Sequence, residues 1–403
     1  MAHISKRAQA TQPSPIRKLK PLADQAQRAG KTIYHLNIGQ PDIPTPKAFL
    51  DGIRDVPKVL AYSPSQGLDE AREALTGYYQ RHNIDLAADQ IVVTAGGSEA
   101  LQFALMAVTD PGDEVLIPEP FYANYGSFAA MAGLDVVPLS TRAEEGFNLP
   151  DRDGLDRAVT SRTKAVLLCN PGNPTGRVYT RDELETLKDF VVEHDLYIIA
   201  DEVYREFVYD GLGHTSVLEF DDLADRAILA DSISKRFSAC GARIGAVASR
   251  NDDVMAAILK FAQARLSPPT LGQLGLIRFL ESDDHQAEVN DIIREFERRR
   301  DLLYEEIQEM PDVVCHKPQG AFYFMVKLPV DDAEKFASWL LSDFDVDGET
   351  VMFAPAAAFY ATPGMGRDEV RIAYVLNESS LKRAMSILQA GVEAYPGSRL
   401  QTA

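Results

Sequence analysis

The stretches AVLLCNPGNPTG (residues 165–176) and LYIIADEVY (residues 196–204) decide the fold class of this 403-residue chain. Each opens with a continuous apolar run of strand length and ends in polar residues. Because the runs do not alternate with polar residues, they indicate strands buried on both faces, as in a parallel sheet covered by helices. The runs IVVTAGG, EVLIPEP, AILADSIS and RIGAVAS, between about residues 90 and 250, alternate with helical patterns. We therefore predict an α/β domain with a mostly parallel central sheet.

The rest of the sequence predicts a second, smaller domain. Residues 282–310 are charged and have helical periodicity, which is typical of a long connecting helix. The runs GAFYFMVKL and EVRIAYV come after it and alternate better, as strands of a half-exposed sheet do. Residues 1–30 are polar and indicate an arm, which the strand-like YHLNIG follows. We predict an N-terminal arm with part of the small domain (1–46), a large domain (47–290) and a C-terminal small α+β domain (291–403).

The composition is that of a folded and strongly acidic protein. Apolar residues make up 45% of the chain and charged residues 25%, which excludes wholesale disorder. The formal net charge of -19 repels phosphate backbones and anionic lipids, so we predict no nucleic-acid partner and no membrane binding. The chain has no run of 18 apolar residues, and its basic N-terminus lacks the apolar core of a secretory signal.

The number and spacing of the cysteines indicate which cellular compartment to expect and whether the chain has a metal site. Cys169, Cys240 and Cys315 are not spaced as CxxC, and no histidine cluster accompanies them. We therefore predict neither a zinc site nor a disulfide framework, and no metal in the site. An odd number of reduced thiols predicts a cytoplasmic location.

Two ionisable residues follow predicted strands, where ligands of an open parallel sheet collect. Lys235, in DSISKRF, comes directly after a buried strand, and burial lowers the pKa of an amine so that it can attack an aldehyde. The alternative is a lysine that reaches solvent. Asp201 ends LYIIADE and can pair with a protonated pyridine nitrogen, or simply cap a helix. A magnesium-binding role needs GxxxxGK[ST] upstream, which the chain lacks.

Other polar residues are candidates for binding anionic groups. Gly97 and Ser98, in AGGSEA, open a predicted helix whose N–H groups can bind phosphate, although a Gly-Gly turn can also serve packing alone. Arg243 can add a bidentate phosphate contact or form a surface ion pair. Asn173 lies in the constrained NPGNPTG loop, which is otherwise a rigid turn. Arg371 lies in an apolar strand and needs a carboxylate, from a ligand or from the protein.

In their order and spacing these motifs resemble the class I/II aminotransferases, which are pyridoxal-phosphate (PLP) enzymes of fold type I. The resemblance runs from about residue 30 to residue 392. Its most specific parts are NPxNPTG, D-E-x-Y after a strand, and S-x-S-K followed by G-x-R-I-G. It implies a large PLP-binding domain with a mostly parallel sheet flanked by helices, and a smaller α+β domain.

The resemblance also implies a role for each site residue. Lys235 looks like the lysine that holds PLP as an aldimine and shuttles the proton between Cα and C4′. Asp201 looks like the partner of the pyridine nitrogen, and Tyr122 stacks on the ring where aspartate enzymes most often have Trp. Asn173 and Tyr204 resemble the pair that binds the phenolic oxygen. The residues that resemble the phosphate site are Gly97, Ser98, Ser232, Ser234 and Arg243.

Substrate binding and assembly follow from the same resemblance. Arg371 resembles the arginine that binds the substrate α-carboxylate, with Gly39 as the backbone contact beside it. Tyr62, in YSPSQG, matches a tyrosine that reaches the phosphate bound to the neighbouring subunit. The resemblance therefore implies a homodimer with shared active sites, acting on an amino acid and a 2-oxo acid.

The motifs indicate the identity of the substrate less clearly than they indicate the cofactor site. One subgroup of aspartate and prephenate aminotransferases carries Lys where this chain has Ser98, and another uses an Arg from the partner subunit, shortly before Pro-Pro, to bind the distal carboxylate. Arg265 precedes Pro268 and Pro269, three residues off that spacing, and Arg17 is a second candidate for a distal carboxylate. Our best interpretation is a ping-pong transfer from aspartate to 2-oxoglutarate.

Three alternatives remain at this point. A broad-specificity aromatic or aliphatic transaminase shares every other motif. A PLP-dependent β-lyase can use the same fold. A PLP-sensing domain of a transcription regulator needs a DNA-binding module, for which the N-terminal arm is too short.

Overall fold

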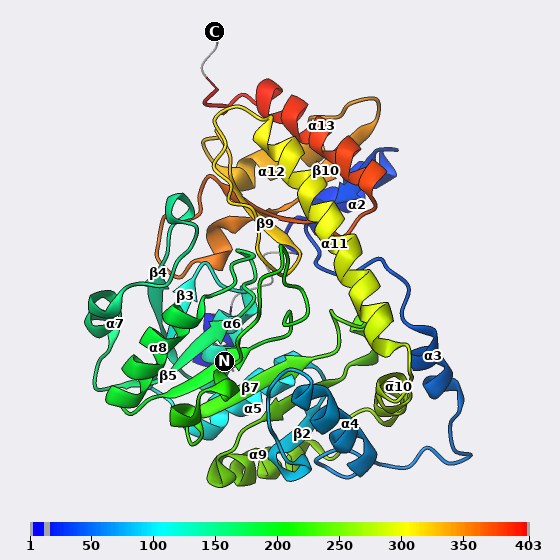
Figure 1. Cartoon of the computed structure of the whole chain (residues 1–403). Helices are drawn as coiled ribbons and strands as arrows, with labels where there is room; N and C mark the ends of the chain where they lie inside the picture. Colours follow the sequence, from blue (N-terminus) through cyan, green and yellow to red (C-terminus); the bar gives the residue numbers. More distant parts are fainter. Residues whose placement is uncertain (1–2, 12–16, 401–403) are drawn as a thin grey trace.

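The computed structural model describes residues 3–11 and 17–400, which form a larger and a smaller region (Figure 1). The larger region surrounds a seven-stranded sheet, and the smaller one contains two short sheets. The long helix α11 (His285–Gln308) extends from one region into the other (Figure 1). Within the described residues, no helix has the length and apolar character needed to cross a membrane.

The seven-stranded sheet confirms the predicted fold class. Its pairs are parallel except that β8 runs antiparallel to both β2 and β7. In spatial order its strands are β2 (Ile91–Thr94), β8 (Gly245–Ala248), β7 (Ala227–Ser232), β6 (Tyr197–Asp201), β5 (Thr163–Cys169), β3 (Glu114–Glu119) and β4 (Asp135–Ser140).

Strand β5 shows why the continuous apolar runs form this sheet. Val166 and Leu168 pack into one buried cluster, while Ala165 and Leu167, on the opposite face, pack into another. Both faces are therefore covered by helices, as an all-apolar strand requires. The first cluster includes residues of α3 (Lys47–Arg54), α4 (Asp69–Gln80), α7 (Arg152–Ala158), α8 (Arg181–Glu193) and α10 (Thr270–Leu280); the second includes residues of α5 (Gly97–Val108), α6 (Asn124–Ala132) and α9 (Asp252–Arg265).

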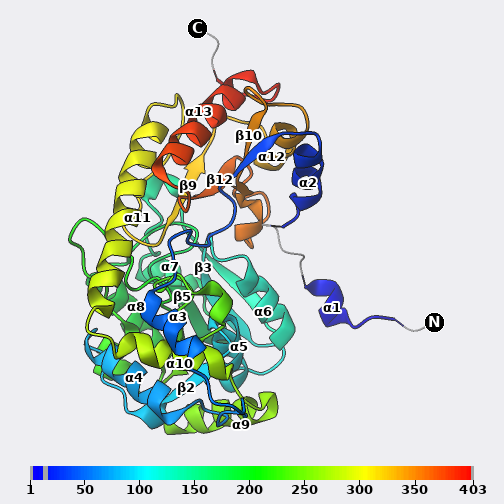
Figure 2. The ribbon, with the colours of Figure 1, turned by 90° about the vertical axis from the view of Figure 1, so that its right-hand side faces the viewer.

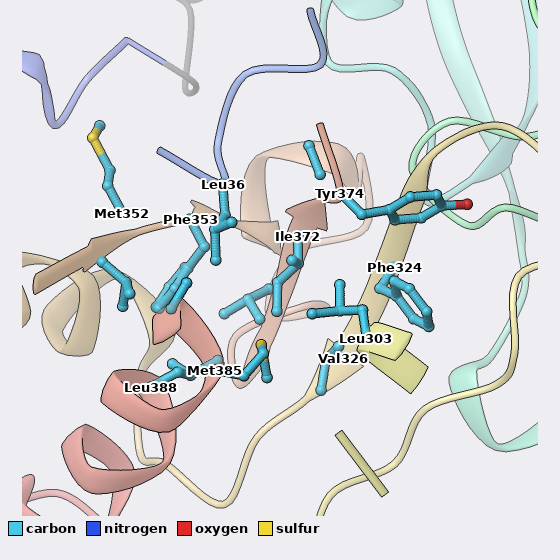
Figure 3. Packing of buried hydrophobic residues seen from close by; sticks show 14 of the residues in the cluster. Leu36, Leu303, Phe324, Val326, Met352, Phe353, Ile372, Tyr374, Met385 and Leu388 are labelled. Atoms are coloured by element: carbon cyan, nitrogen blue, oxygen red, sulfur yellow. The ribbon is translucent and has the colours of Figure 1, made fainter. Parts of the chain in front are cut away.

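The smaller region packs its helices around two short sheets. Residues Leu303, Phe324, Ile372 and Met385 lie together in its core (Figure 3). One sheet is antiparallel, with β11 (Ala354–Pro355), β12 (Glu369–Ala373) and β9 (Tyr323–Lys327); the other pairs β1 (Thr32–His35) with β10 (Glu349–Met352) in parallel. The helices are α2 (Lys20–Arg28), α11, α12 (Ala333–Ser342) and α13 (Glu378–Ala394).

Short 3₁₀ helices and one separate α-helix complete the described chain. The 3₁₀ helices are Ala88–Gln90, Ala143–Glu145, Val217–Glu219, Asp221–Leu223, Cys240–Ala242 and Ala356–Phe359. Helix α1 (Lys6–Ala10) contacts α6 at the side of the larger region (Figure 2).

Two local predictions differ from the structure. Strands β9 and β12 were expected to be half exposed, but β12 is buried throughout and β9 at all but its last residue. Helices cover one face, and the other face turns Met325 and Arg371 towards the larger region. Residues 20–28, expected to belong to an arm, form α2, because Ala23 and Ala26 bury one face of this polar helix against α12 and β1. The domain boundaries at residues 46 and 290 stay a prediction.

Gly245 allows the closest backbone approach in the large sheet. A Cβ atom there would lie 2.6 Å from the Asp231 carbonyl oxygen and 2.6 Å from the Gly96 carbonyl carbon. Both neighbours are backbone atoms and cannot rotate away.

We expect Gly245→Ala to lower the free energy of unfolding by about 1–3 kcal/mol, the usual cost of overpacking. Thermal denaturation followed by circular dichroism measures this as a lower Tm. Gly241→Ala is the matched control, because a Cβ atom at Gly241 would meet nothing within 4 Å. Equal Tm values for the two variants would contradict the expectation.

Candidate active site

A cavity of about 560 Å³ opens where the carboxyl ends of several strands of the large sheet face the smaller region. Polar residues at or after the ends of β5, β6 and β7 meet there with residues of β9 and β12 and with residues that follow β1. Of the site residues predicted from the sequence, the cavity is lined by Gly39, Gly97, Ser98, Tyr122, Asn173, Asp201, Tyr204, Ser232, Ser234, Lys235, Arg243 and Arg371. Within the described part of the chain, no group of three or more His, Cys, Asp or Glu side chains is placed to hold a metal ion.

Lys235 projects into the cavity from the turn that follows β7. Its Nζ donates a hydrogen bond of 2.6 Å to the carbonyl oxygen of Gly39. Burial lowers the pKa of Lys235, and the positive charges of Arg371 and Arg243 lower it further. The amine is therefore easier to deprotonate than an exposed lysine, which suits it to act as a nucleophile and a base.

Asp201, the last residue of β6, is a buried carboxyl group in the cavity wall. Its Oδ2 accepts a 2.6 Å hydrogen bond from the Tyr125 hydroxyl, and its Oδ1 accepts one of 3.3 Å from the Val203 N–H. Burial raises the pKa of Asp201 to about 6, although both hydrogen bonds favour the charged form. A cationic group beside this carboxylate would relieve the unfavourable burial of its charge.

At one end of the cavity, hydrogen-bond donors surround a single location. Helix α5 begins at Gly97, so the positive end of its dipole faces the cavity. Ser232 and Ser234 present hydroxyl groups whose oxygens lie 2.9 Å apart. Arg243 donates to the carbonyl oxygens of Ala95 and Cys240, both at 3.1 Å. A helix N-terminus, two hydroxyls and a guanidinium are suited to bind a phosphate group.

Gly96 makes room for the guanidinium of Arg243. Its φ is 97°, a left-handed conformation that favours glycine. A Cβ atom at this position would also lie 2.5 Å from Nη2 of Arg243. Glycine is therefore required at residue 96 because the Arg243 guanidinium lies so close to it and because the backbone is left-handed where α5 begins.

Arg371 is almost completely buried, with 1% of its surface exposed. Its Nη1 donates to Asn173 Oδ1 at 3.1 Å and its Nη2 donates to the Asn37 carbonyl oxygen at 2.6 Å. The guanidinium lies over the rings of Tyr323 and Phe359, with centroid distances of 4.6 and 5.0 Å. Within residues 3–11 and 17–400 it has no carboxylate partner, so the sequence alternative of an internal Asp or Glu is not realised there.

Asn173 connects Arg371 to a pair of tyrosines. Its Nδ2 donates to the Tyr204 hydroxyl at 3.4 Å, and that hydroxyl is 2.8 Å from the hydroxyl of Tyr323. The Tyr323 hydroxyl also packs against Gly39, where a Cβ atom would lie 1.8 Å from it. Only glycine fits at residue 39, and its carbonyl group thereby stays within reach of Lys235.

Tyr122 forms another part of the cavity wall. Its hydroxyl accepts a hydrogen bond of 2.8 Å from Asn124 Nδ2. Burial raises the pKa of Tyr122, while the positive charges of Arg371 and Arg17 act in the opposite direction. The ring therefore stays neutral and offers a flat apolar surface to a ligand.

Two predicted site residues lie outside this cavity. Arg265 donates to Glu99 Oε2 at 2.7 Å and to the Ser65 carbonyl oxygen at 2.8 Å, and the same Glu99 oxygen accepts the Ala95 N–H. This arginine therefore holds the Ala95 turn within its own chain. Tyr62 is 79% exposed and does not reach the cavity of its own chain. Their predicted roles at a subunit interface stay predictions.

Comparison with known proteins now decides the family. Residues 31–388 match the family model described as "Aminotransferase class I and II". The chain belongs to this family. The aromatic-amino-acid aminotransferase 2 of Thermococcus litoralis is 34% identical over 96% of this chain and 97% of the relative. The aspartate/prephenate aminotransferase of Thermus thermophilus is 32% identical over 96% of this chain and 97% of the relative.

A solved structure agrees with this assignment. A single mutant of the aspartate aminotransferase of Thermus thermophilus superposes with a TM-score of 0.88 at 31% identity, over 97% of this chain and all of that one. The predicted family and fold class are therefore confirmed, and the protein is an enzyme of the aminotransferase class.

The sequence analysis missed two tyrosines that line this cavity. Tyr125 lies three residues after Tyr122, and the turn that leads into α6 brings the two rings into edge-to-face contact, so their short spacing was a usable signal. Tyr323 lies on β9 and enters the cavity because this sheet is buried on both faces. Cys169 and Cys240 also line the cavity, where they are free thiols.

We expect Tyr125→Phe to raise the pKa of Asp201 above its value of about 6, because the lost hydrogen bond favours the ionised carboxylate. Infrared difference spectra of the protonated carboxyl group, recorded as a function of pH without added ligand, measure the change. Asp201→Asn identifies the band by removing it. An unchanged or lower midpoint in Tyr125→Phe would show that the tyrosine does not stabilise the charged form.

Proposed function

We propose that this aminotransferase uses pyridoxal 5'-phosphate to move the amino group of an L-amino acid, aspartate in the first place, to 2-oxoglutarate in a ping-pong reaction. The observation that carries the proposal is one cavity that combines the amine of Lys235, the carboxyl group of Asp201, a phosphate-type donor set and the guanidinium of Arg371, which has no carboxylate partner among the described residues.

The residues present fit the cofactor. The start of α5 at Gly97 and Ser98, with Ser232, Ser234 and Arg243, supplies donors for a phosphate group. At another part of the wall Asp201 supplies a buried negative charge for a protonated pyridine nitrogen. The ring of Tyr122 supplies an apolar surface for stacking, and the cavity volume of about 560 Å³ is in the usual range for a cofactor site.

When bound, PLP supplies an electron sink for the pair of electrons that remains when a proton leaves the substrate Cα. The buried negative charge of Asp201 would hold a proton on the ring nitrogen and would thereby strengthen this electron sink. Asn173 and Tyr204 would hold the phenolic oxygen through the amide and hydroxyl groups that already contact each other. These three residues therefore adjust the electronic state of the cofactor.

Lys235 performs the covalent and proton-transfer work. Its amine would hold the cofactor covalently and would become free to act as a base once the amino group of the substrate had replaced it. Because burial lowers its pKa, this amine would be suited to accept the proton from the substrate Cα and to return it at C4′ of the cofactor. The carbonyl oxygen of Gly39 orients the amine before the substrate arrives.

Arg371 orients the substrate. We assign its guanidinium to the α-carboxylate, which every α-amino acid carries, and Gly39 to the backbone contact beside it. Burial between two aromatic rings makes this a desolvated and strong site for a carboxylate. Fixing this group directs the Cα–H bond towards Lys235.

We also propose a homodimer with shared active sites in the cytoplasm. Tyr62 is exposed beside other large apolar side chains of the same stretch, including Val59 (75%) and Leu60 (55%), which favours burial against a second subunit. In that arrangement Tyr62 donates to the phosphate held by its partner. Free thiols at Cys169, Cys240 and Cys315 are compatible with a reducing compartment.

A second candidate substrate class is favoured by one observation. The relative from Thermococcus litoralis is named as an aromatic-amino-acid aminotransferase, and its identity of 34% is similar to that of the aspartate/prephenate enzyme. A screen of the twenty amino acids with 2-oxoglutarate separates the two classes. Release of keto acid without glutamate formation would point instead to elimination chemistry.

With PLP added, we expect borohydride to fix the cofactor covalently to Lys235, because reduction makes its bond to the amine permanent. Peptide mapping by mass spectrometry locates the label. Lys235→Ala should carry no label and no transaminase activity, whereas Lys260→Ala, a change on the exposed side of α9, should keep both. A label at another lysine in the wild-type protein would remove Lys235 from its role.

We expect Asp201→Asn to lower kcat for transamination by about 10²–10³-fold, since charge stabilisation of this kind is typically worth a few kcal/mol. Bound PLP is quantified by absorbance, so that loss of the cofactor is not mistaken for slow chemistry. Asp253→Asn, an exposed carboxylate at the start of α9, is the control. Near-normal turnover by a PLP-loaded Asp201→Asn variant would exclude Asp201 from the mechanism.

A further inference from the structure

Arg17 lies in the N-terminal segment where that segment lines the cavity. Helix α1 contacts α6, and α6 begins at Asn124, itself a residue of the cavity wall. Helix α2, which begins three residues after Arg17, packs against α12 of the smaller region (Figure 2). Helices α1 and α2 therefore contact different regions, and Arg17, shortly before α2, lies at the cavity between these regions.

The proposed function gives each basic side chain of the cavity a separate role, except for one that has no role yet. Among the described residues, those that line the cavity and are basic are Arg17, Lys235, Arg243 and Arg371. The proposed function uses Lys235 for chemistry, Arg243 for the phosphate and Arg371 for the α-carboxylate. Arg17 remains for another anion, and a substrate with a second carboxylate brings one.

Arg17 is also available for a ligand. Its side chain is exposed, and with the described residues it forms neither an ion pair nor a hydrogen bond. Its charge acts inside the cavity, since it stabilises the ionised form of Tyr122 against the effect of burial. Its neighbour Lys18, by contrast, forms an ion pair with Glu334 on the surface of the smaller region.

Arg265, the other arginine considered for this role, is already engaged. Its guanidinium bonds to Glu99 and to the carbonyl oxygens of Ser65 and Val93. A substrate carboxylate that bound there would compete with Glu99, a carboxylate of its own chain. Within one chain, Arg17 is therefore the better placed of the two.

We propose that Arg17 binds the side-chain carboxylate of the substrate and thereby selects dicarboxylic amino acids and 2-oxo acids over monocarboxylic ones. The inference rests on the proposed function, because it takes Arg371 as the anchor of the α-carboxylate. Two cationic anchors at different parts of the wall then fix both ends of aspartate, glutamate and 2-oxoglutarate, whereas alanine or phenylalanine uses only one.

Binding of unreactive acids tests the inference without catalysis. We expect Arg17→Gln to raise the Kd of succinate, measured by isothermal titration calorimetry on the PLP-loaded enzyme, by about 10- to 100-fold, the scale of a charged hydrogen bond. The Kd of butyrate, which has one carboxylate, should change by less than about twofold, since it loses no such bond. Lys18→Gln removes one positive charge from the same segment and should affect neither acid. Equal effects of Arg17→Gln on both acids, or no effect on either, would overturn the inference.

Kinetics separate failure of this inference from failure of the proposed function. In Arg17→Gln, kcat/KM should fall by about 10- to 100-fold for aspartate and glutamate and stay nearly constant for alanine and phenylalanine. A selective loss in Arg265→Gln with none in Arg17→Gln would assign the second carboxylate to Arg265 and overturn the inference while leaving the function intact. Absence of transamination with all twenty amino acids would refute the proposed function, and the succinate comparison would still decide whether Arg17 binds a second carboxylate.

Discussion

The active site depends on one buried carboxylate, that of Asp231 at the end of β7. Its two oxygens accept hydrogen bonds from both terminal nitrogens of Arg236, at 2.6 and 3.0 Å, and from the hydroxyl of Tyr79 at 2.8 Å. It also accepts the N–H of Ser232 at 2.7 Å. Burial opposes ionisation, yet the charges of Arg236 and Arg205 hold the pKa of Asp231 well below its usual range. The strand end is therefore linked to the residue that follows Lys235, and the intervening turn can adopt only a narrow set of conformations.

This ion cluster explains how a loop can hold reactive groups in place. Removal of one partner from a buried pair leaves the other charge desolvated, which costs far more than the pair itself contributes. The ion pair between Asp231 and Arg236 therefore restrains the turn that joins them. Ser232, Ser234 and Lys235 all belong to this turn. Gly245 and Gly96 complete the arrangement by letting β8 and the Arg243 guanidinium approach to distances that no Cβ atom permits.

The sequence predicted the parts of this structure that depend on local pattern. Continuous apolar runs such as that of β5 require helices on both faces, and polar residues at the ends of parallel strands must meet at one edge, so the fold class and most of the cavity wall were foreseeable. The edge strand β4 was not found, because its mixed and partly exposed residues carry no clear pattern. The full burial of β12 was also missed, since it results from packing against residues distant in sequence. Likewise the sequence showed how many residues separate Arg265 from Pro268 and Pro269. It did not show that Glu99 forms an ion pair with Arg265 and neutralises its charge.

The distribution of charge adds a last constraint on what the enzyme can bind. The chain carries a formal net charge of -19, which on average repels an anionic substrate. At physiological ionic strength, however, charges beyond about 8 Å are largely screened, so the surface contributes little to binding inside the cavity. Among the described residues that line it, four are basic and Asp201 alone is acidic. Selection between one and two carboxylates therefore depends on a few direct contacts with the cavity wall, and the overall acidity bears on solubility rather than on the reaction.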